Sequence, residues 1–197
     1  MYSPKHFQMN DAALAAKLIA ENPLATLIGP DERGHPFVSH LPMCLVDEDD
    51  GWSLEGHMAR ANPHWGWLCA QGELLAVFTG PDAYISPRHY DTRLSVPTWN
   101  YVAVHVRGRF ELVDEIEAKE QVLKRLIAQH DPEYNAQWTE LPEDYKLNLL
   151  KAIVGFRIRV DRWEAKAKLS QNRAATERER IRSASTPEMR GWLDLMA

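Results

Sequence analysis

The chain has 197 residues, 45% of them hydrophobic and 26% charged, and a formal net charge of −5. These values describe an ordinary globular protein that is long enough to bury a substantial core. The negative charge argues against a surface generally dedicated to phosphate backbones, although a local basic patch stays compatible with it. Because the sequence contains no run of eighteen apolar residues and no charged-then-apolar leader, we expect no membrane partner and a cytoplasmic location.

The cysteines and histidines indicate neither a disulfide nor a metal site. Cys44 and Cys69 lie inside apolar segments without a Cys-x-x-Cys spacing, which predicts buried, reduced thiols. A common zinc motif has two histidines at positions i and i+4 with an acidic residue between them. No such pair is formed by His35, His64, His89 and His105. No serine or cysteine occupies a nucleophile elbow, so the sequence assigns no catalytic residue.

Hydrophobic periodicity predicts the helices and strands in chain order. Amphipathic spacing predicts helices over residues 11–22, 62–69, 114–129 and 145–150. Alternating or continuous apolar runs predict strands over residues 24–29, 36–46, 52–57, 73–79, 101–112 and 154–160. Antiparallel strands with few helices between them predict a mainly β fold with peripheral helices, closed or half-closed into a barrel, because a wide sheet curls to protect its edges.

The C-terminal segment is polar at first and apolar at its end. Residues 172–185 show no apolar face, and their arginines are interleaved with glutamates, which is typical of a solvated charged segment. The predicted helices do not form the pair that a helix-turn-helix requires. We expect the last apolar side chains to dock on a partner subunit: Trp192, Leu193, Leu195 and Met196.

The segment from Gly80 to Tyr101 concentrates aromatic residues between two proline-bounded turns, where an ordinary loop would be small and polar. Tyrosine and tryptophan present a flat apolar face with a polar tip. Such side chains suit stacking on a planar ligand or packing against a second subunit. For any single one of them, closure of the end of a barrel is the alternative interpretation.

Three further stretches combine residue types that bind ligands, although the common nucleotide-binding glycine motifs are absent. In residues 57–63 a strand ends, Arg60 supplies a cation and a helix begins, which suits a phosphate; a solvated loop cation is the alternative. Ser39 and His40 interrupt an apolar strand and face either a ligand or the core. Residues 163–173 place lysine, glutamine and asparagine where they could cover the edge of a ring, or form a solvated loop.

Six motifs, in this order, resemble the PaiB-type FMN-binding negative transcriptional regulator family: Met1–Phe7, Ser39–Pro42, Gly56–Pro63, Gly80–Pro87, Val96–Tyr101 and Lys168–Arg173. The resemblance implies an FMN-binding split β-barrel, similar to pyridoxamine phosphate oxidase, that works as a homodimer with flavin sites between subunits. It also implies a repressor, with DNA as a partner. The barrel domain would span residues 1–171, and residues 172–197 would form a polar segment and a short helix docked on the dimer.

The resemblance also implies roles for ten residues. Those on the phosphate and ribityl side of FMN would be Ser39, His40, His57 and Arg60. Those approaching the ring, from the other subunit, would be Thr98, Trp99 and Asn100. Those closing the site would be Lys168, Gln171 and Asn172.

The sequence leaves open whether the chain is an enzyme. The same type of fold hosts flavin-dependent oxidases, reductases and haem-degrading proteins, and a fold alone does not choose among them. A flavin-dependent oxidoreductase, of the FMN reductase, oxidase or haem-utilisation type, is therefore the main alternative, with His105 and Tyr84 as proton donors. A third interpretation is a binding module whose flavin site is empty.

Overall fold

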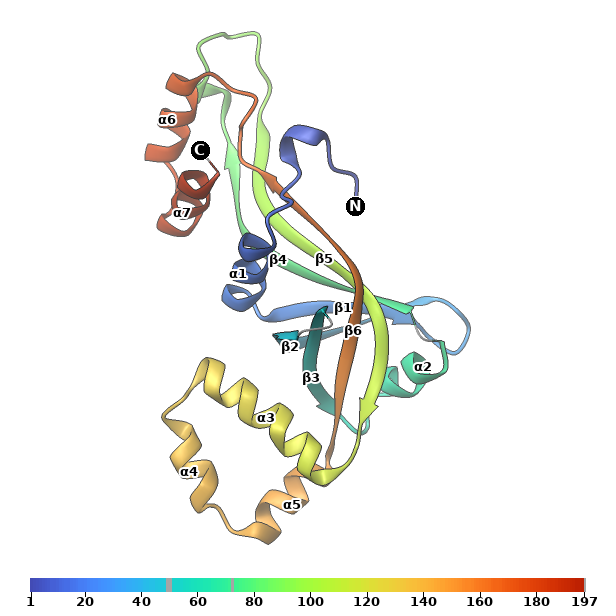
Figure 1. Ribbon diagram of the computed structural model, residues 1–197. Helices are drawn as coiled ribbons and strands as arrows, with labels where there is room; N and C mark the ends of the chain where they lie inside the picture. Colours follow the sequence, from blue (N-terminus) through green and yellow to red (C-terminus); the bar gives the residue numbers. More distant parts are fainter. Residues whose placement is uncertain (49–50, 72, 197) are drawn as a thin grey trace. The chain divides into compact units, whose positions relative to one another are not determined.

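A computed structural model describes residues 1–48, 51–71 and 73–196 (Figure 1). Its strands are β1 (Leu24–Pro30), β2 (Pro36–Glu48), β3 (Gly51–Ala59), β4 (Glu73–Ile85), β5 (Thr98–Val113) and β6 (Ile153–Lys168). Its α-helices are α1 (Ala12–Glu21), α2 (His64–Gln71), α3 (Ile116–His130), α4 (Tyr134–Glu140), α5 (Glu143–Lys151), α6 (Ala175–Ser183) and α7 (Pro187–Leu195). Short 3-10 helices are η1 (Lys5–Phe7) and η2 (Pro87–His89). Among the described helices, none is long and apolar enough to cross a membrane.

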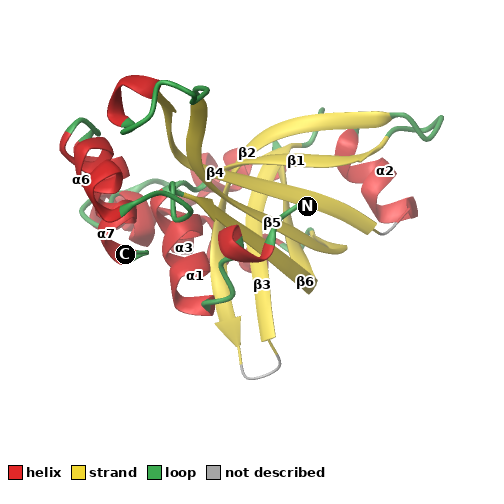
Figure 2. Cartoon of the chain, turned by 90° about the horizontal axis from the view of Figure 1, so that it is seen from above, coloured by secondary structure: helices red, strands yellow, loops and turns green. Residues whose placement is uncertain are grey.

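The strands form a closed barrel in the order β1-β2-β3-β6-β5-β4 (Figure 2). The pairs β1–β2, β1–β4, β2–β3 and β3–β6 are all antiparallel, with Leu24 opposite Pro42 and Gly56 opposite Phe156. The expected mainly β barrel with peripheral helices is therefore confirmed.

The chain divides into two compact units. The first contains residues 1–21, 79–105 and 164–197, and the second contains residues 22–78 and 106–163. In the second unit α3 packs against β2 and β3, and α2 packs against β1. Its core is apolar and fully buried, with Leu27, Leu54, Phe78, Phe156 and Ile158. The domain boundary expected after residue 171 stays a prediction.

Strand β4 is longer than the sequence pattern predicts. The expected strand ends at Thr79, because Gly80-Pro81 is a turn signal, but β4 continues to Ile85. A Cβ at position 80 would lie 2.5 Å from Cδ1 of Leu18. The glycine therefore lets α1 approach the strand closely, and it does not mark a turn.

The C-terminal segment also differs from the prediction. Residues expected to be solvated form α6, which buries Ile181. The following helix α7 begins at Thr186-Pro187, where the threonine hydroxyl accepts a hydrogen bond from the backbone N–H of Met189. Helix α6 contacts both α7 and η2, and Ile181 is its one large apolar side chain, so a single such residue suffices for a helix that is covered by neighbouring elements.

One cysteine prediction is wrong. Both thiols are free and Cys44 is buried, but Cys69 is exposed. Helix α2 buries His64 and Leu68, and Cys69 lies on its outward side.

Candidate functional site

Three of the sequence motifs meet around a cavity of about 230 Å³ within the first unit. We call it the Asn100 cavity. The segments that line it are the start of β5 with the two residues before it, the turn after β6, and η1. Its lining residues are His6, Phe7, Val96, Pro97, Thr98, Asn100, Lys168, Ser170, Asn172 and Arg173. Four of the ten predicted site residues therefore lie on one cavity.

The turn after β6 has an unusual backbone. Ser170 has a φ of 62°, in the left-handed region that residues other than glycine seldom adopt. Its Oγ donates a hydrogen bond to Oδ1 of Asn100, over 3.0 Å. The side chain of Gln171 spans the turn: its Oε1 accepts from the N–H of Leu169, and its Nε2 donates to the carbonyl of Ala167. Gln171 thus shapes the turn and does not line the cavity.

The polar atoms of the cavity wall are partly satisfied. Nζ of Lys168 donates to Oγ1 of Thr98, over 2.5 Å. The side chain of Asn100 is fully buried, and its Nδ2 has no hydrogen-bond partner in the part of the chain that the structure describes. A buried amide donor without a partner costs free energy, so this atom points to an acceptor supplied by a ligand.

Trp99 does not line the Asn100 cavity. The side chain is 52% exposed and packs edge-on against Tyr84, with ring centroids 6.2 Å apart. Because side chains alternate along a strand, Thr98 and Asn100 face the cavity while Trp99 faces away.

Arg173 lines the cavity and is a residue that the sequence prediction missed. Its guanidinium lies 3.7 Å from the ring centroid of Tyr90, and its Nη1 lies 4.0 Å from a carboxylate oxygen of Glu177. The only sequence signal for it was its place at the end of the Lys168–Arg173 motif.

The other predicted residues lie in the second unit. Oγ of Ser39 is 2.9 Å from Nδ1 of His64 and accepts a hydrogen bond from Nδ2 of Asn62. Oδ1 of Asn62 in turn accepts from the N–H of His64 and so caps the start of α2. The Ser39 hydroxyl thus makes two hydrogen bonds within the chain, which leaves one of its three hydrogen-bonding positions for another partner.

The two predicted histidines differ in their surroundings. Nδ1 of His40 lies 3.2 Å from Oγ1 of Thr26 across the β1–β2 pair. Nδ1 of His57 is buried and has no partner among the described residues. Burial lowers the pKa of His57, which favours the neutral ring.

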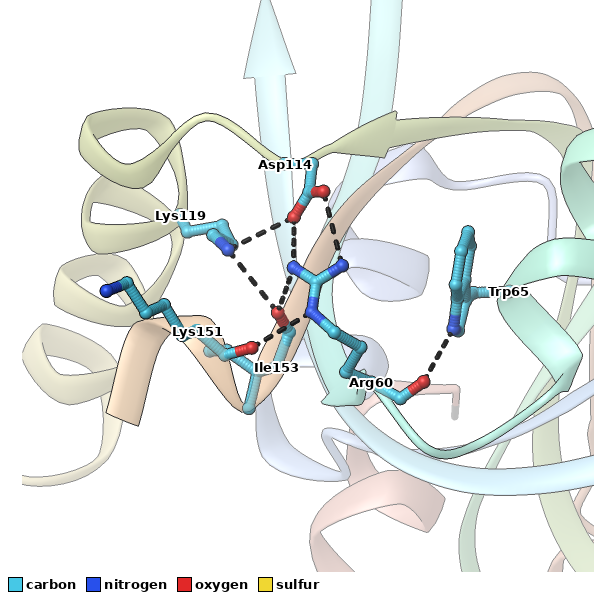
Figure 3. A network of polar contacts seen from close by, with 6 residues as sticks. All are labelled: Arg60, Trp65, Asp114, Lys119, Lys151 and Ile153. Atoms are coloured by element: carbon cyan, nitrogen blue, oxygen red, sulfur yellow. Dashed lines mark hydrogen bonds and ion pairs between the residues drawn. The ribbon is translucent and has the colours of Figure 1, made fainter. Parts of the chain in front are cut away.

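Arg60 belongs to a polar network where β3, β5 and α5 end (Figure 3). Its guanidinium donates to both carboxylate oxygens of Asp114 and to the carbonyl oxygens of Lys151 and Ile153. Asp114 also accepts from Nζ of the buried Lys119, over 3.1 Å. The hydrogen bonds from Arg60 and Lys119 lower the pKa of Asp114. The network carries two cations and one anion, so it keeps one excess positive charge.

The closed six-stranded barrel and its peripheral helices define the class of protein by its fold: a mainly β barrel. Two solved structures show the same fold. The FAD and heme binding protein from Mycobacterium smegmatis matches with a TM-score of 0.67 and 20% identity, over 91% of this chain and 80% of that one. The flavocytochrome Anf3 from Azotobacter vinelandii matches with a TM-score of 0.66 and 17% identity, over 82% and 69%.

The chain belongs to the family whose model, described as "Putative FMN-binding domain", matches residues 1–162. It is 35% identical over 201 residues to the protease synthase and sporulation protein PAI 2 of Bacillus subtilis, covering 100% of this chain and 96% of that protein. It is also 34% identical over 130 residues to the protein YKL070W of Saccharomyces cerevisiae, covering 55% and 76%. The PaiB-type family and the cofactor FMN are therefore confirmed, the cofactor through the family.

The Asn100 cavity suits part of an FMN molecule. It offers the unpartnered amide of Asn100, the ammonium of Lys168 and the amide of Asn172 to the acceptor atoms of a flavin ring edge. Its volume of about 230 Å³ lies below the range of roughly 300–1,000 Å³ that is usual for complete ligand pockets. A cavity of this size would hold only part of the cofactor.

Proposed function

We propose that this protein is an FMN-binding negative transcriptional regulator of the PaiB type, which acts as a homodimer in the cytoplasm and holds the edge of the flavin ring in the Asn100 cavity. The observation that carries the flavin site is the buried Nδ2 of Asn100, which lacks a partner in the described chain and lies on the same cavity as Lys168. FMN supplies redox chemistry where it is bound, and here it acts as a sensor or a structural ligand.

The ring side of the site consists of this chain's own hydrogen-bonding groups. Asn100 donates to a ring acceptor, and Ser170 fixes the orientation of its amide through Oδ1. The ammonium of Lys168 donates one hydrogen bond to Thr98 and has further N–H groups to donate to the ligand. Asn172 covers the ring edge, Gln171 keeps the turn in shape, and Trp99 offers its exposed indole to the partner protomer.

The phosphate and ribityl side is assigned to Ser39, His40, His57 and Arg60 of the other protomer. Arg60 makes four hydrogen bonds to the described chain, which leaves one Nη1 hydrogen of its five donors for a phosphate oxygen. The unpartnered Nδ1 of His57 accounts for a second contact.

Two observations support the homodimer. The Asn100 cavity is too small for a complete cofactor site. In addition, the segment beside it exposes large apolar side chains, at 57% for Tyr84, 95% for Leu94, 73% for Val96 and 52% for Trp99. Exposed apolar side chains gathered in one segment are typical of an interaction surface.

The regulatory role is supported by the full-length likeness to the Bacillus protein named for protease synthesis and sporulation. Two arginines of α6 are hydrogen-bonded to carboxylates of the same unit, Arg180 to Asp91 and Arg182 to Asp194, each over 2.5 Å. Because these guanidiniums are already neutralised at close range, we do not assign them to contacts with a phosphate backbone.

The test combines flavin binding with turnover. Purified protein is mixed with excess FMN and desalted, its absorbance spectrum is recorded, and NADH or NADPH is then added without oxygen. We expect retained flavin and no turnover, together with a shift of promoter DNA fragments in a gel assay. Rapid reduction with turnover would instead establish the alternative, a flavin-dependent oxidoreductase. Loss of all flavin on desalting would refute the site.

The oxidoreductase alternative rests on one observation. The described residues that line the Asn100 cavity include cations but no carboxylate, and such a lining favours a reduced flavin with negative charge.

A further inference from the structure

The Asn100 cavity has a charge that the residues inferred from the sequence do not account for. Lys168 and Arg173 both line it, and no aspartate or glutamate does so among the residues that the structure describes. Arg173 pairs with the carboxylate of Glu177, which does not line the cavity, at 4.0 Å. The three groups together carry one net positive charge next to the cavity.

Arg173 is held in place from two sides. The ring of Tyr90 lies against its guanidinium, at 3.7 Å from the centroid, and only 27% of the Arg173 side chain is exposed. Glu177 is itself fixed, because its Oε1 accepts a hydrogen bond from the N–H of Asp91 over 2.8 Å. A cation that is already ordered loses less entropy when it binds an anion than a flexible surface arginine does.

Helix α6 also holds the loop around Tyr90, through Arg180. Nη2 of Arg180 pairs with Asp91, and its Nε donates to the carbonyl oxygen of His89 over 2.8 Å. Helix α6 thus fixes the loop that carries Tyr90 and, through Tyr90 and Glu177, the position of Arg173.

We propose that Arg173, with Lys168, forms an anion subsite in the Asn100 cavity and contacts the negatively charged group of the ligand. Arg173 is the residue that presents charge, and Asn100 is the neutral donor beside it. In a flavin the charge has two sources: the phosphate of FMN, or the ring when it is reduced. The proposal rests on the proposed function for the identity of the ligand, but the subsite itself requires only an anion.

The experiment compares Arg173→Gln with the wild type. Affinities are measured by fluorescence or absorbance titration for FMN and for riboflavin, which lacks the phosphate, each oxidised and after anaerobic reduction with dithionite. A hydrogen bond to a charged group is worth about 1.5–3 kcal/mol. We therefore expect Arg173→Gln to weaken binding of the charged form by about tenfold or more.

The pattern of losses identifies the source of the charge. A loss for FMN but not for riboflavin assigns the phosphate, and the Asn100 cavity would then hold the phosphate end of FMN in place of the ring edge. A loss for the reduced forms of both flavins assigns the ring. If the ratio of the affinities for reduced and oxidised flavin falls tenfold, the midpoint potential of the bound flavin should fall by about 30 mV for a two-electron couple. Unchanged affinity for all four ligands would overturn the proposal.

Two controls separate charge from folding. Arg173→Lys keeps the cation and should restore most of the affinity, whereas a purely structural role for the guanidinium on Tyr90 would not be rescued. Arg178→Gln removes a neighbouring cation of α6 that is not on the cavity, and it should leave all affinities unchanged. Thermal unfolding of each variant checks that α6 stays folded.

Inorganic phosphate serves as a probe that does not depend on flavin. Its binding is followed by calorimetry in the wild type and in Arg173→Gln. If the wild type binds no flavin but binds phosphate through Arg173, the proposed function fails and the anion subsite stands. If phosphate and flavin both bind independently of Arg173, the subsite fails and the proposed function stands.

Discussion

Asn100 shows how one buried atom can indicate a ligand. Its Nδ2 is the polar group of the cavity that the described chain leaves without a partner, while its Oδ1 is held by Ser170. Natural proteins seldom keep such a group unless it serves a function, since it costs about 1–3 kcal/mol.

We predict that Asn100→Leu separates stability from binding. Without ligand, the gain from removing an unpartnered donor roughly offsets the lost bond to Ser170, so the free energy of unfolding should change by less than about 1 kcal/mol. The affinity for FMN should fall by about tenfold or more. Denaturant unfolding and flavin titration measure the two effects. The control Asn135→Leu, at an exposed position of α4, should change neither the free energy of unfolding nor the affinity for FMN. If Asn100→Leu binds FMN as tightly as the wild type, Nδ2 of Asn100 does not donate to the flavin.

The Arg60–Asp114–Lys119 network predicts a pH dependence of stability. The pKa of Asp114 is lowered by its bonds to Arg60 and Lys119, so the network stabilises the fold above the ordinary aspartate value of 3.8 and loses this contribution as the pH falls below it. Asp114→Asn should cost about 1–2 kcal/mol at pH 7, a value reduced from that of a buried pair because the carboxylate is 41% exposed.

The gap in unfolding free energy between wild type and Asp114→Asn should therefore narrow below about pH 4, because the protonated aspartate then resembles asparagine. Denaturant titrations at several pH values measure it. Asp161→Asn removes an exposed pair with Arg109 and should cost less than about 0.5 kcal/mol at any pH. A gap that stays constant down to pH 3 would contradict this role of Asp114.

At the scale of the elements, the close approach of the neighbouring strands β5 and β6 depends on one glycine, Gly108. A Cβ at position 108 would lie 2.1 Å from the carbonyl oxygen of Arg159 and 2.9 Å from Cγ2 of Ile158. Because the first of these atoms belongs to the backbone of the neighbouring strand, it cannot move aside without disturbing the barrel.

Gly108→Ala should destabilise the protein by about 1–3 kcal/mol or more, as overpacking of a core does. The matched control is Gly66→Ala in α2, where a Cβ would meet no atom within 4 Å. Replacing a glycine inside a helix should stabilise it by about 0.5–1 kcal/mol. Thermal or denaturant unfolding measures the change in the free energy of unfolding for both variants. We expect a decrease for Gly108→Ala and an increase for Gly66→Ala.

The elements that follow a strict period were predictable, and those that depend on a distant partner were not. The alternation of valines in β5 predicts a strand over 101–112, and the strand extends over Thr98–Val113. The end of β4 was misplaced because Gly80 serves the approach of α1, which no local pattern reveals. Helix α6 was missed because Ile181 is its one large apolar residue, and a lone apolar residue gives no periodic signal.

The candidate site was predictable to a similar degree. Thr98, Asn100, Lys168 and Asn172 were inferred from motifs, and the structure places them on one cavity. Arg173 was not inferred as a site residue, because its proposed role depends on Tyr90, which only the tertiary structure brings to it.

At the scale of the whole molecule, the proposed homodimer makes a specific prediction. Leu94 is 95% exposed, lies in the aromatic segment and does not line the Asn100 cavity. We expect Leu94→Asp to shift the protein from dimer to monomer and to reduce FMN binding with it, because a buried charge opposes association. Sedimentation and flavin titration at matched concentrations test this. Leu149→Asp, at a 41% exposed position of α5, is the control and should leave the dimer intact. A wild-type monomer that retains FMN would rule out a shared site.

The two walls of the Asn100 cavity have a further consequence for how the molecule is made. Thr98 and Lys168 are bonded to each other although 70 residues separate them, and the same separation lies between Asn100 and Ser170. During synthesis at roughly 5–20 residues per second, the first wall therefore waits several seconds before the second exists. At the proposed site the cofactor is captured only after this long loop has closed, so the colour of bound flavin would report a late stage of folding and not its beginning.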